Sequence, residues 1–286
     1  MGAALPGAAG DVPGLGATCA EPPGRPFRSR RTSNRAGESV HGFLVTPAGD
    51  PPFPTVMWVH GGPTWMYADD WQPNFQTLVD HGFAVALPNY RGSTGYGVAW
   101  RDRLVGDIGF PEVEDVLAWL DALVADGTAD PERAAMVGWS WGGYLTLLML
   151  GLHPGRFAAG VAGVPVGDYA ASYEDLSPPL QAYDRYLLGG GIDEKAELVR
   201  ERSPITYADR VRTPVLCLIG EHDSRCPPRQ AYLWVDAVRA RGGDVEVYSY
   251  ETGHSSFVVD EEIRQMRAVL DFLGRRLDGD ERREDE

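Results

Sequence analysis

Short apolar runs alternate along the chain with longer segments of helical periodicity. Several of these runs are apolar on both faces, which is typical of strands buried inside a parallel sheet. The predicted strands are residues 41–46, 55–60, 83–88, 134–139, 159–164, 214–220 and 245–250.

Between these strands the apolar positions repeat with the period of an α-helix. Residues 111–126 begin with a proline and carry one apolar stripe, formed by Val113, Val116, Leu117, Leu120 and Leu123. Residues 228–240 and 261–276 repeat this pattern. The alternation of strand and helix predicts an α/β fold with a mostly parallel central sheet and helices on both of its faces.

The predicted elements lie within residues 39–276, which we expect to form a single α/β domain. A chain of 286 residues of which 43% are hydrophobic can bury a core of that size. Residues 1–38 are rich in Gly, Pro and Arg and are expected to be a poorly ordered N-terminal segment. Residues 277–286 are mostly charged and are expected to form a frayed tail.

The acidic charge balance argues against nucleic acid and anionic membranes as partners. The formal net charge is -15 and the pI is near 4.8, whereas phosphate binding requires clustered positive charge. The one basic cluster, residues 25–35, is expected to be solvated. Residues 134–155 carry no charged side chain and are long enough to cross a membrane, but three glycines break them into a short strand and a short helix. We therefore expect no membrane span.

The cysteines and the N-terminal residues bear on cofactors and location. Cys19, Cys217 and Cys226 show no paired spacing, so the sequence predicts neither a disulfide framework nor a zinc site, and no metal or organic cofactor is expected. The first residues lack the charged n-region and unbroken apolar run of a signal peptide, which predicts a cytoplasmic location. The sequence does not decide the oligomeric state, and a homo-oligomer is compatible with it.

Ser140 lies where a predicted strand turns into a predicted helix, in the sequence GWSWGGY at residues 138–144. A G-x-S-x-G pattern in this setting is typical of a nucleophile elbow. The turn strains the serine backbone, and side chains at positions 138 and 142 would collide with the neighbouring strand and helix. We interpret Ser140 as a nucleophile whose Oγ lies near a helix N-terminus; the alternative is a structural turn that requires a small residue.

A serine nucleophile requires a base and an orienting acid, which follow it in the chain order Ser, Asp or Glu, His. Asp223 follows the sixth predicted strand and His254 follows the seventh, at the sheet edge where open α/β folds place their sites. Glu221 is the rival acid, but its side chain should point away from Asp223 in an extended turn. His222 belongs to the acid's own turn and is the less suitable base.

The oxyanion formed in such a reaction requires two hydrogen-bond donors. The backbone N–H of Trp141, the residue after the nucleophile, supplies one of them. The second is expected from the HGGP sequence at residues 60–63, whose glycines let the backbone approach a substrate carbonyl. His60 is expected to anchor this loop rather than to carry protons.

Six motifs in the same order resemble the catalytic domain of the prolyl oligopeptidase family of serine peptidases, with the dipeptidyl and acylaminoacyl peptidase branches most similar. They are HGGP (60–63), NYRGSTGYG (89–97), GDIG (106–109), DPERAAMVGWSWGGY (130–144), GEHDSRCP (220–227) and GH (253–254). The resemblance covers about residues 40–275. It implies Ser140, Asp223 and His254 as the triad and the N–H of Gly62 as the second oxyanion donor. It also suggests a P1 pocket with apolar walls formed by Val166, Tyr169 and Tyr173.

The chain also departs from these branches. Their members carry a large β-propeller before the hydrolase domain, whereas only about 40 residues precede the first predicted strand here. We therefore expect either a free-standing domain with an open active site or a shortened form of a longer protein. Residues 166–205, rich in Tyr, Leu and Gly, are expected to act as a mobile partial lid. The elbow has Trp139 and Trp141 where relatives have a smaller or polar residue and tyrosine.

The sequence thus predicts an α/β-hydrolase-fold serine peptidase that cleaves short or N-terminally modified peptides through an acyl-enzyme intermediate. Its partner is expected to be a small peptide or acyl substrate. The alternative enzyme is an esterase or acyltransferase acting on a small-molecule acyl substrate, because a triad does not select the leaving group. The alternative outside enzymes is a catalytically idle binding module, against which the intact triad counts.

Overall fold

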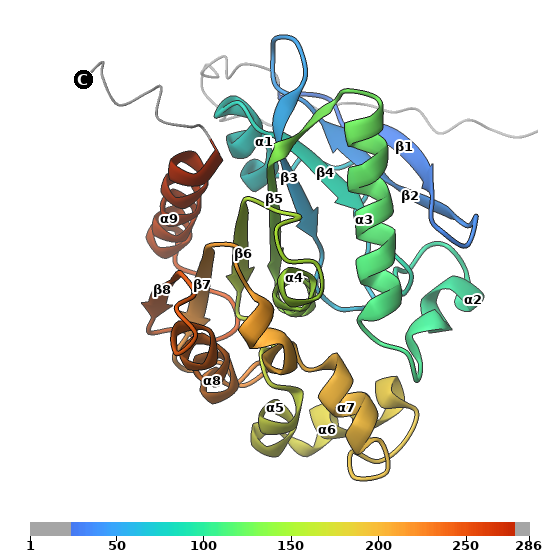
Figure 1. Cartoon of the computed structure of the whole chain (residues 1–286), viewed down its shortest axis with the longest axis vertical. Coiled ribbons are helices and arrows are strands. Elements are labelled where there is room, and N and C mark those ends of the chain that lie inside the picture. Colours follow the sequence, from blue (N-terminus) through green and yellow to red (C-terminus); the bar gives the residue numbers. More distant parts are fainter. Residues whose placement is uncertain (1–23, 278–286) are drawn as a thin grey trace, which may run out of the picture.

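One sheet forms the centre of the part of the chain that the computed structural model describes, residues 24–277 (Figure 1). Its strands are β1 (Arg28–Ser33), β2 (Ser39–Val45), β3 (Phe53–Val59), β4 (Ala84–Pro88), β5 (Ala129–Trp139), β6 (Ala159–Gly163), β7 (Val215–Gly220) and β8 (Val245–Tyr250). They lie in the order β1-β2-β4-β3-β5-β6-β7-β8. All strands from β3 to β8 run parallel, while β2 is antiparallel to both of its neighbours. The predicted α/β fold with a mostly parallel sheet is confirmed.

Helices cover both faces of this sheet (Figure 1). They are α1 (Pro73–Asp80), α2 (Val98–Arg101), α3 (Phe110–Ala125), α4 (Trp141–Leu152), α5 (Tyr169–Asp175), α6 (Pro178–Leu188), α7 (Ala196–Arg202), α8 (Pro228–Arg239) and α9 (Val259–Leu277), with 3-10 turns at Asp102–Leu104 and Pro204–Arg210. Within residues 24–277, no helix combines the length and apolarity that crossing a membrane requires.

The central strands are buried on both faces because successive side chains point to opposite sides of the sheet. In β3, Met57 and Val59 belong to the core beneath α3, α4 and α8, whereas Val56 and Trp58 belong to the core beneath α1 and α9. This double burial explains why the strand sequence reads as an uninterrupted apolar run.

β1 corrects the expectation that residues 1–38 are poorly ordered. Residues 28–33 pair antiparallel with β2 along their full length, from Arg28 opposite Leu44 to Ser33 opposite Ser39. The expectation is therefore wrong for residues 24–38, while residues 1–23 lie outside the described part. An edge strand is held by backbone hydrogen bonds and needs no apolar alternation, so its polar sequence gives no strand signal.

The predicted C-terminal tail at residues 277–286 lies outside the described part except for its first residue. Leu277 is the last residue of α9 and is buried in the core beneath that helix.

Helices α5, α6 and α7 lie together at the end of the molecule where the chain leaves β6 (Figure 1). They fall within the segment predicted as a partial lid, for which no helices were expected. Two of these three helices begin with a recognisable sequence signal. The Asp168 side chain caps α5, accepting hydrogen bonds from the N–H groups of Ala170 and Ala171, and α6 begins with two prolines. The mobility of this segment stays a prediction.

Candidate active site

Ser140 connects β5 to α4 in a backbone conformation that L-amino acids rarely adopt. Its φ is 59° and its ψ is -120°, and its N–H donates to the carbonyl of Gly163 at 2.8 Å. Close backbone packing explains the flanking glycines: a Cβ at Gly138 would lie 2.4 Å from the backbone of Gly142, and one at Gly142 would lie 2.3 Å from the Val59 carbonyl. The strained turn predicted from the sequence is therefore present, with the serine partly exposed.

Asp223 and His254 meet at the carboxyl ends of β7 and β8. His254 Nδ1 lies 2.7 Å from Asp223 Oδ2, while Asp223 Oδ1 accepts hydrogen bonds from the backbone N–H groups of Arg225 at 2.7 Å and Cys226 at 2.9 Å. The Asp223 carboxylate is buried, so these three contacts fix its orientation. Because a carboxylate can only accept, Nδ1 carries the proton and Nε2 is free to act as an acceptor.

The rival residues in the same turn are occupied elsewhere. Glu221 accepts a hydrogen bond from the Tyr232 hydroxyl on α8 at 2.5 Å. His222 is exposed and lies 3.7 Å from Glu251. The structure thus brings Asp223, and not Glu221, to His254.

Ser140 and Cys226 line the same pocket. No hydrogen bond between the Ser140 hydroxyl and His254 is found within residues 24–277. Hydroxyl–imidazole contacts are often long before substrate binds, because they tighten only when the substrate aligns both groups. Burial, reinforced by the charge of Asp223, raises the pKa of the Cys226 thiol, so this thiol stays protonated and is no rival nucleophile.

Asp223, Cys226 and His254 also bring three ligand-type atoms within 4.8 Å of one another. The hydrogen bond between Asp223 and His254 already satisfies two of these atoms, and a thiol with a raised pKa is a poor metal ligand. The arrangement suits an oriented acid–base pair better than a metal centre.

The loop between β3 and α1 packs directly on the elbow. A Cβ at Gly61 would lie 3.0 Å from the Trp139 carbonyl and 3.3 Å from Ser140 Cβ. Gly62 has a φ of 128°, which favours glycine, and it lines the same pocket as Ser140 and Trp141. The two predicted oxyanion donors therefore lie beside the candidate nucleophile.

His60 anchors this loop, as the sequence predicted. Its ring stacks on Tyr90 with centroids 4.2 Å apart, and its Nε2 lies 2.8 Å from Ser93 Oγ. Burial lowers the pKa of His60 to about 4, so the ring is neutral and unsuited to carrying protons near pH 7.

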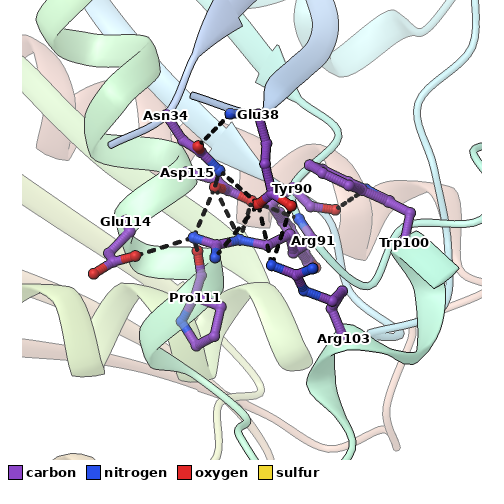
Figure 2. A network of polar contacts seen from close by, with 9 residues as sticks. All are labelled: Asn34, Glu38, Tyr90, Arg91, Trp100, Arg103, Pro111, Glu114 and Asp115. Atoms are coloured by element: carbon purple, nitrogen blue, oxygen red, sulfur yellow. Dashed lines mark hydrogen bonds and ion pairs between the residues drawn. The ribbon is translucent and has the colours of Figure 1, made fainter. Parts of the chain in front are cut away.

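A buried polar network fixes the loop after β4, which carries both Tyr90 and Ser93. Figure 2 shows Arg91 at the centre of this network: its Nε lies 3.1 and 3.0 Å from the two oxygens of Asp115 on α3, and its Nη2 donates to the Pro111 carbonyl at 2.9 Å. The Arg91 N–H also donates to Asp115 at 2.7 Å. Since Tyr90 and Ser93 contact His60, this network also stabilises the position of the loop between β3 and α1.

The two tryptophans of the elbow point to opposite faces of the sheet. Trp139 stacks on Trp58 of β3 with centroids 5.0 Å apart and an interplanar angle of 8°. Trp141 is buried, and its Nε1 donates to Oε1 of Glu112 on α3 at 3.3 Å. Glu112 is thus a contact of Trp141 that was not predicted from the sequence, because nothing in its spacing signals this contact.

A pocket of about 110 Å³ opens beside Ser140. Its walls come from the two oxyanion candidates, from helices α5 and α6 and from the loops next to β6 and β7. Besides Ser140, the lining residues are Gly62, Trp141, Val166, Tyr169, Ser172, Leu176, Leu180, Tyr183, Asp184, Arg225 and Cys226. The predicted pocket residues Val166 and Tyr169 are among them. The α6 residues were missed, although the spacing of Leu180, Tyr183 and Leu187 after the prolines is typical of one helix face.

Tyr173 does not line this pocket, which corrects the sequence prediction. Residues 169, 172 and 176 of the α5 segment face the pocket, at the spacing of one helix face. Tyr173 lies on the adjacent side of the helix, where its hydroxyl accepts a hydrogen bond from Arg185 at 2.7 Å.

Comparisons with known proteins agree with this architecture. The family model described as the prolyl oligopeptidase family matches residues 70–280. The uncharacterized peptidase YuxL of Bacillus subtilis is 32% identical over 241 residues, which are 83% of this chain and 36% of that protein. The acylamino-acid-releasing enzyme of Sus scrofa is 30% identical over 249 residues, 82% of this chain and 34% of its own.

Among solved structures, a puromycin-hydrolyzing peptidase of Mycobacterium tuberculosis is similar, with a TM-score of 0.84 and 31% identity over 88% of this chain and 39% of that chain. The present chain thus spans about a third of the length of the curated relatives it matches.

Proposed function

Since this chain belongs to the prolyl oligopeptidase family of serine peptidases, we propose that it hydrolyses short or N-terminally modified peptides through Ser140, Asp223 and His254. The family resemblance expected from the sequence is confirmed. The substrate class and the roles of the three residues are the parts that we propose.

The first half of the reaction forms an acyl-enzyme. The Ser140 hydroxyl turns to Nε2 of His254 and attacks the acyl carbon while the imidazole takes its proton. Asp223 holds the imidazolium that results. The N–H groups of Trp141 and Gly62 donate to the oxyanion, and collapse of the tetrahedral intermediate expels the amine, which takes the proton from His254.

The second half returns the enzyme to its starting state. A water molecule gives a proton to Nε2 of His254 and attacks the acyl-enzyme carbonyl, and the new tetrahedral intermediate expels Ser140, which regains that proton. The product is a carboxylic acid.

The observation that carries the proposal is the Asp223–His254 pair beside the strained Ser140 elbow. A 2.7 Å contact between a buried carboxylate and Nδ1 selects the tautomer that a general base for serine needs. The relatives of this chain include an acylamino-acid-releasing enzyme and a puromycin-hydrolyzing peptidase, and these activities support small substrates rather than folded proteins.

The test is a side-by-side assay of peptide anilides and short acyl esters with wild type and three variants. We expect hydrolysis of the anilides, its loss in Ser140→Ala and a large loss in Asp223→Asn, whereas Glu221→Gln serves as the matched control and keeps activity. Turnover of esters alone would favour the esterase alternative. Residual anilide turnover in Ser140→Ala within about tenfold of wild type would contradict the nucleophile assignment.

A further inference from the structure

The pocket beside Ser140 contains a carboxylate that the proposed reaction does not use. Asp184, on α6, lines this pocket together with Gly62, Ser140 and Trp141. At about 110 Å³ the pocket is smaller than the 300–1,000 Å³ that is usual for whole ligands, so it suits one side chain or a chain terminus. Because Ser140 and the two proposed oxyanion residues, Gly62 and Trp141, line this pocket, we expect the group that enters it to belong to the acyl part of the substrate.

The Asp184 carboxylate lacks a counter-ion. Its Oδ1 accepts a hydrogen bond from the Tyr169 hydroxyl at 3.2 Å, and within residues 24–277 no Lys, Arg or His nitrogen lies within 4.0 Å of it. The guanidinium of the adjacent Arg185 donates to Tyr173, and Arg225, which also lines the pocket, is exposed. Within the described residues, the Asp184 charge is therefore held in the pocket with a hydrogen bond from Tyr169 but without a counter-ion within 4.0 Å.

Partial burial makes this charge sensitive to a bound cation. Desolvation raises the pKa of Asp184 to about 6, so the carboxylate is ionised at pH 7 but poorly solvated. A positively charged group brought into the pocket restores the lost stabilisation, whereas a carboxylate would be repelled.

The remaining walls suit a short aliphatic stem. Val166, Leu176, Leu180 and Tyr183 line the pocket together with Ser140 and Asp184. Apolar walls that end at a carboxylate match a group with methylenes next to the reacting carbon and a charged nitrogen beyond them.

We propose that this pocket binds a primary ammonium group on the acyl part of the substrate, with Asp184 as its counter-ion. The ammonium comes from one of two sources: the free α-amine of an N-terminal residue or the side-chain amine of a lysine-like P1 residue. The inference rests on the proposed function, because it takes Ser140 as the group that attacks the acyl carbon.

Two matched substrate pairs with one leaving group distinguish the sources. Comparing kcat/KM for alanine anilide with that for Nα-acetyl-alanine anilide tests the α-amine. Comparing kcat/KM for Nα-acetyl-lysine anilide with that for Nα-acetyl-norleucine anilide tests the side-chain amine. We expect the ammonium-bearing member of one pair to have a kcat/KM about tenfold or more above that of its neutral partner.

The informative variant is Asp184→Asn, which removes the charge and keeps an oxygen for the Tyr169 hydroxyl. We expect this variant to reduce the difference in kcat/KM between the two members of the preferred pair to within about twofold. Glu174→Gln is the matched control, because it removes the same charge from the neighbouring α5, where Glu174 is exposed and pairs with Arg229 at 2.8 Å. The proposal is overturned if wild type turns over the ammonium-bearing and the neutral member of each pair equally. It is also overturned if a preference for the ammonium-bearing member persists in Asp184→Asn.

Failure of the proposed function is recognised separately. If no anilide is cleaved, p-nitrophenyl 6-aminohexanoate against p-nitrophenyl hexanoate applies the same comparison to esters. If Ser140 proves unreactive altogether, saturation-transfer NMR of n-butylammonium and n-butanol still decides the inference. Binding of the ammonium to wild type but not to Asp184→Asn supports it, and equal signals from both proteins refute it.

Discussion

The buried carboxyl of Glu112, which contacts Trp141, should make the stability of this protein depend on pH. Glu112 lies in the first turn of α3 and is fully buried. Its Oε1 accepts from the Trp141 indole, and its Oε2 has no hydrogen-bond partner within the described residues. Burial raises the pKa of Glu112 from 4.5 to about 8, so the folded protein holds this carboxyl protonated near pH 7.

The sign and size of the effect follow from the two pKa values. Between pH 4.5 and 8 the unfolded chain has lost this proton while the folded protein keeps it, so the free energy of unfolding falls as pH rises. The free energy of unfolding falls by about 1.4 kcal/mol per pH unit in this range, so the loss attributable to Glu112 between pH 5 and pH 8 is about 3 to 4 kcal/mol. Above the folded pKa the contribution stays constant.

The perturbation is Glu112→Gln, which keeps the shape and the acceptor for Trp141 but cannot ionise. Urea denaturation of both proteins at pH 5, 6, 7 and 8 measures the difference in free energy of unfolding. We expect the variant to be within about 1 kcal/mol of wild type at pH 5 and more stable by about 4 kcal/mol at pH 8. Glu132→Gln, an exposed change on β5, is the control and should give a constant difference. A constant difference for Glu112→Gln as well would refute the reasoning.

Three further changes test other parts of the structure. Gly142→Ala places a Cβ 2.3 Å from the Val59 carbonyl and should lower the free energy of unfolding by about 3 kcal/mol in urea denaturation; an unchanged midpoint would contradict the packing at the elbow. Arg91→Met leaves the Asp115 charge buried and should lower that free energy by about 3 to 5 kcal/mol, with part of the loss recovered in Arg91→Met/Asp115→Asn; additive losses would argue against the pair. The kcat/KM ratio of ammonium to neutral substrates should fall as pH drops through about 6, because protonation neutralises Asp184, and a ratio constant from pH 5 to 8 would contradict this.

The central strands and the positions of Asp223 and His254 at the strand ends could be predicted, because the strands have a local signal and the two residues directly follow strands. Double burial makes a central strand apolar over its whole length, as in β3, and chain order alone places Asp223 and His254 after the last two strands. β1 lacks such a signal, since its stability comes from backbone pairing with β2.

The pocket beside Ser140 could not be predicted because it depends on contacts between distant segments. Asp184 is far from Ser140 in the chain, and it lines the same pocket only because of how α5, α6 and the turn between them fold. Cys226 likewise lines this pocket from a distant segment, and a lone cysteine without paired spacing carries no sequence signal.

The most direct test of the account is the site of covalent modification by a fluorophosphonate, read by mass spectrometry of the digested protein. The account predicts one adduct, on the peptide that contains Ser140 and on that residue, with labelling strongly slowed in His254→Ala because the base that takes the hydroxyl proton is missing. An adduct on another serine, or labelling of Ser140 at the same rate in wild type and His254→Ala, would contradict it.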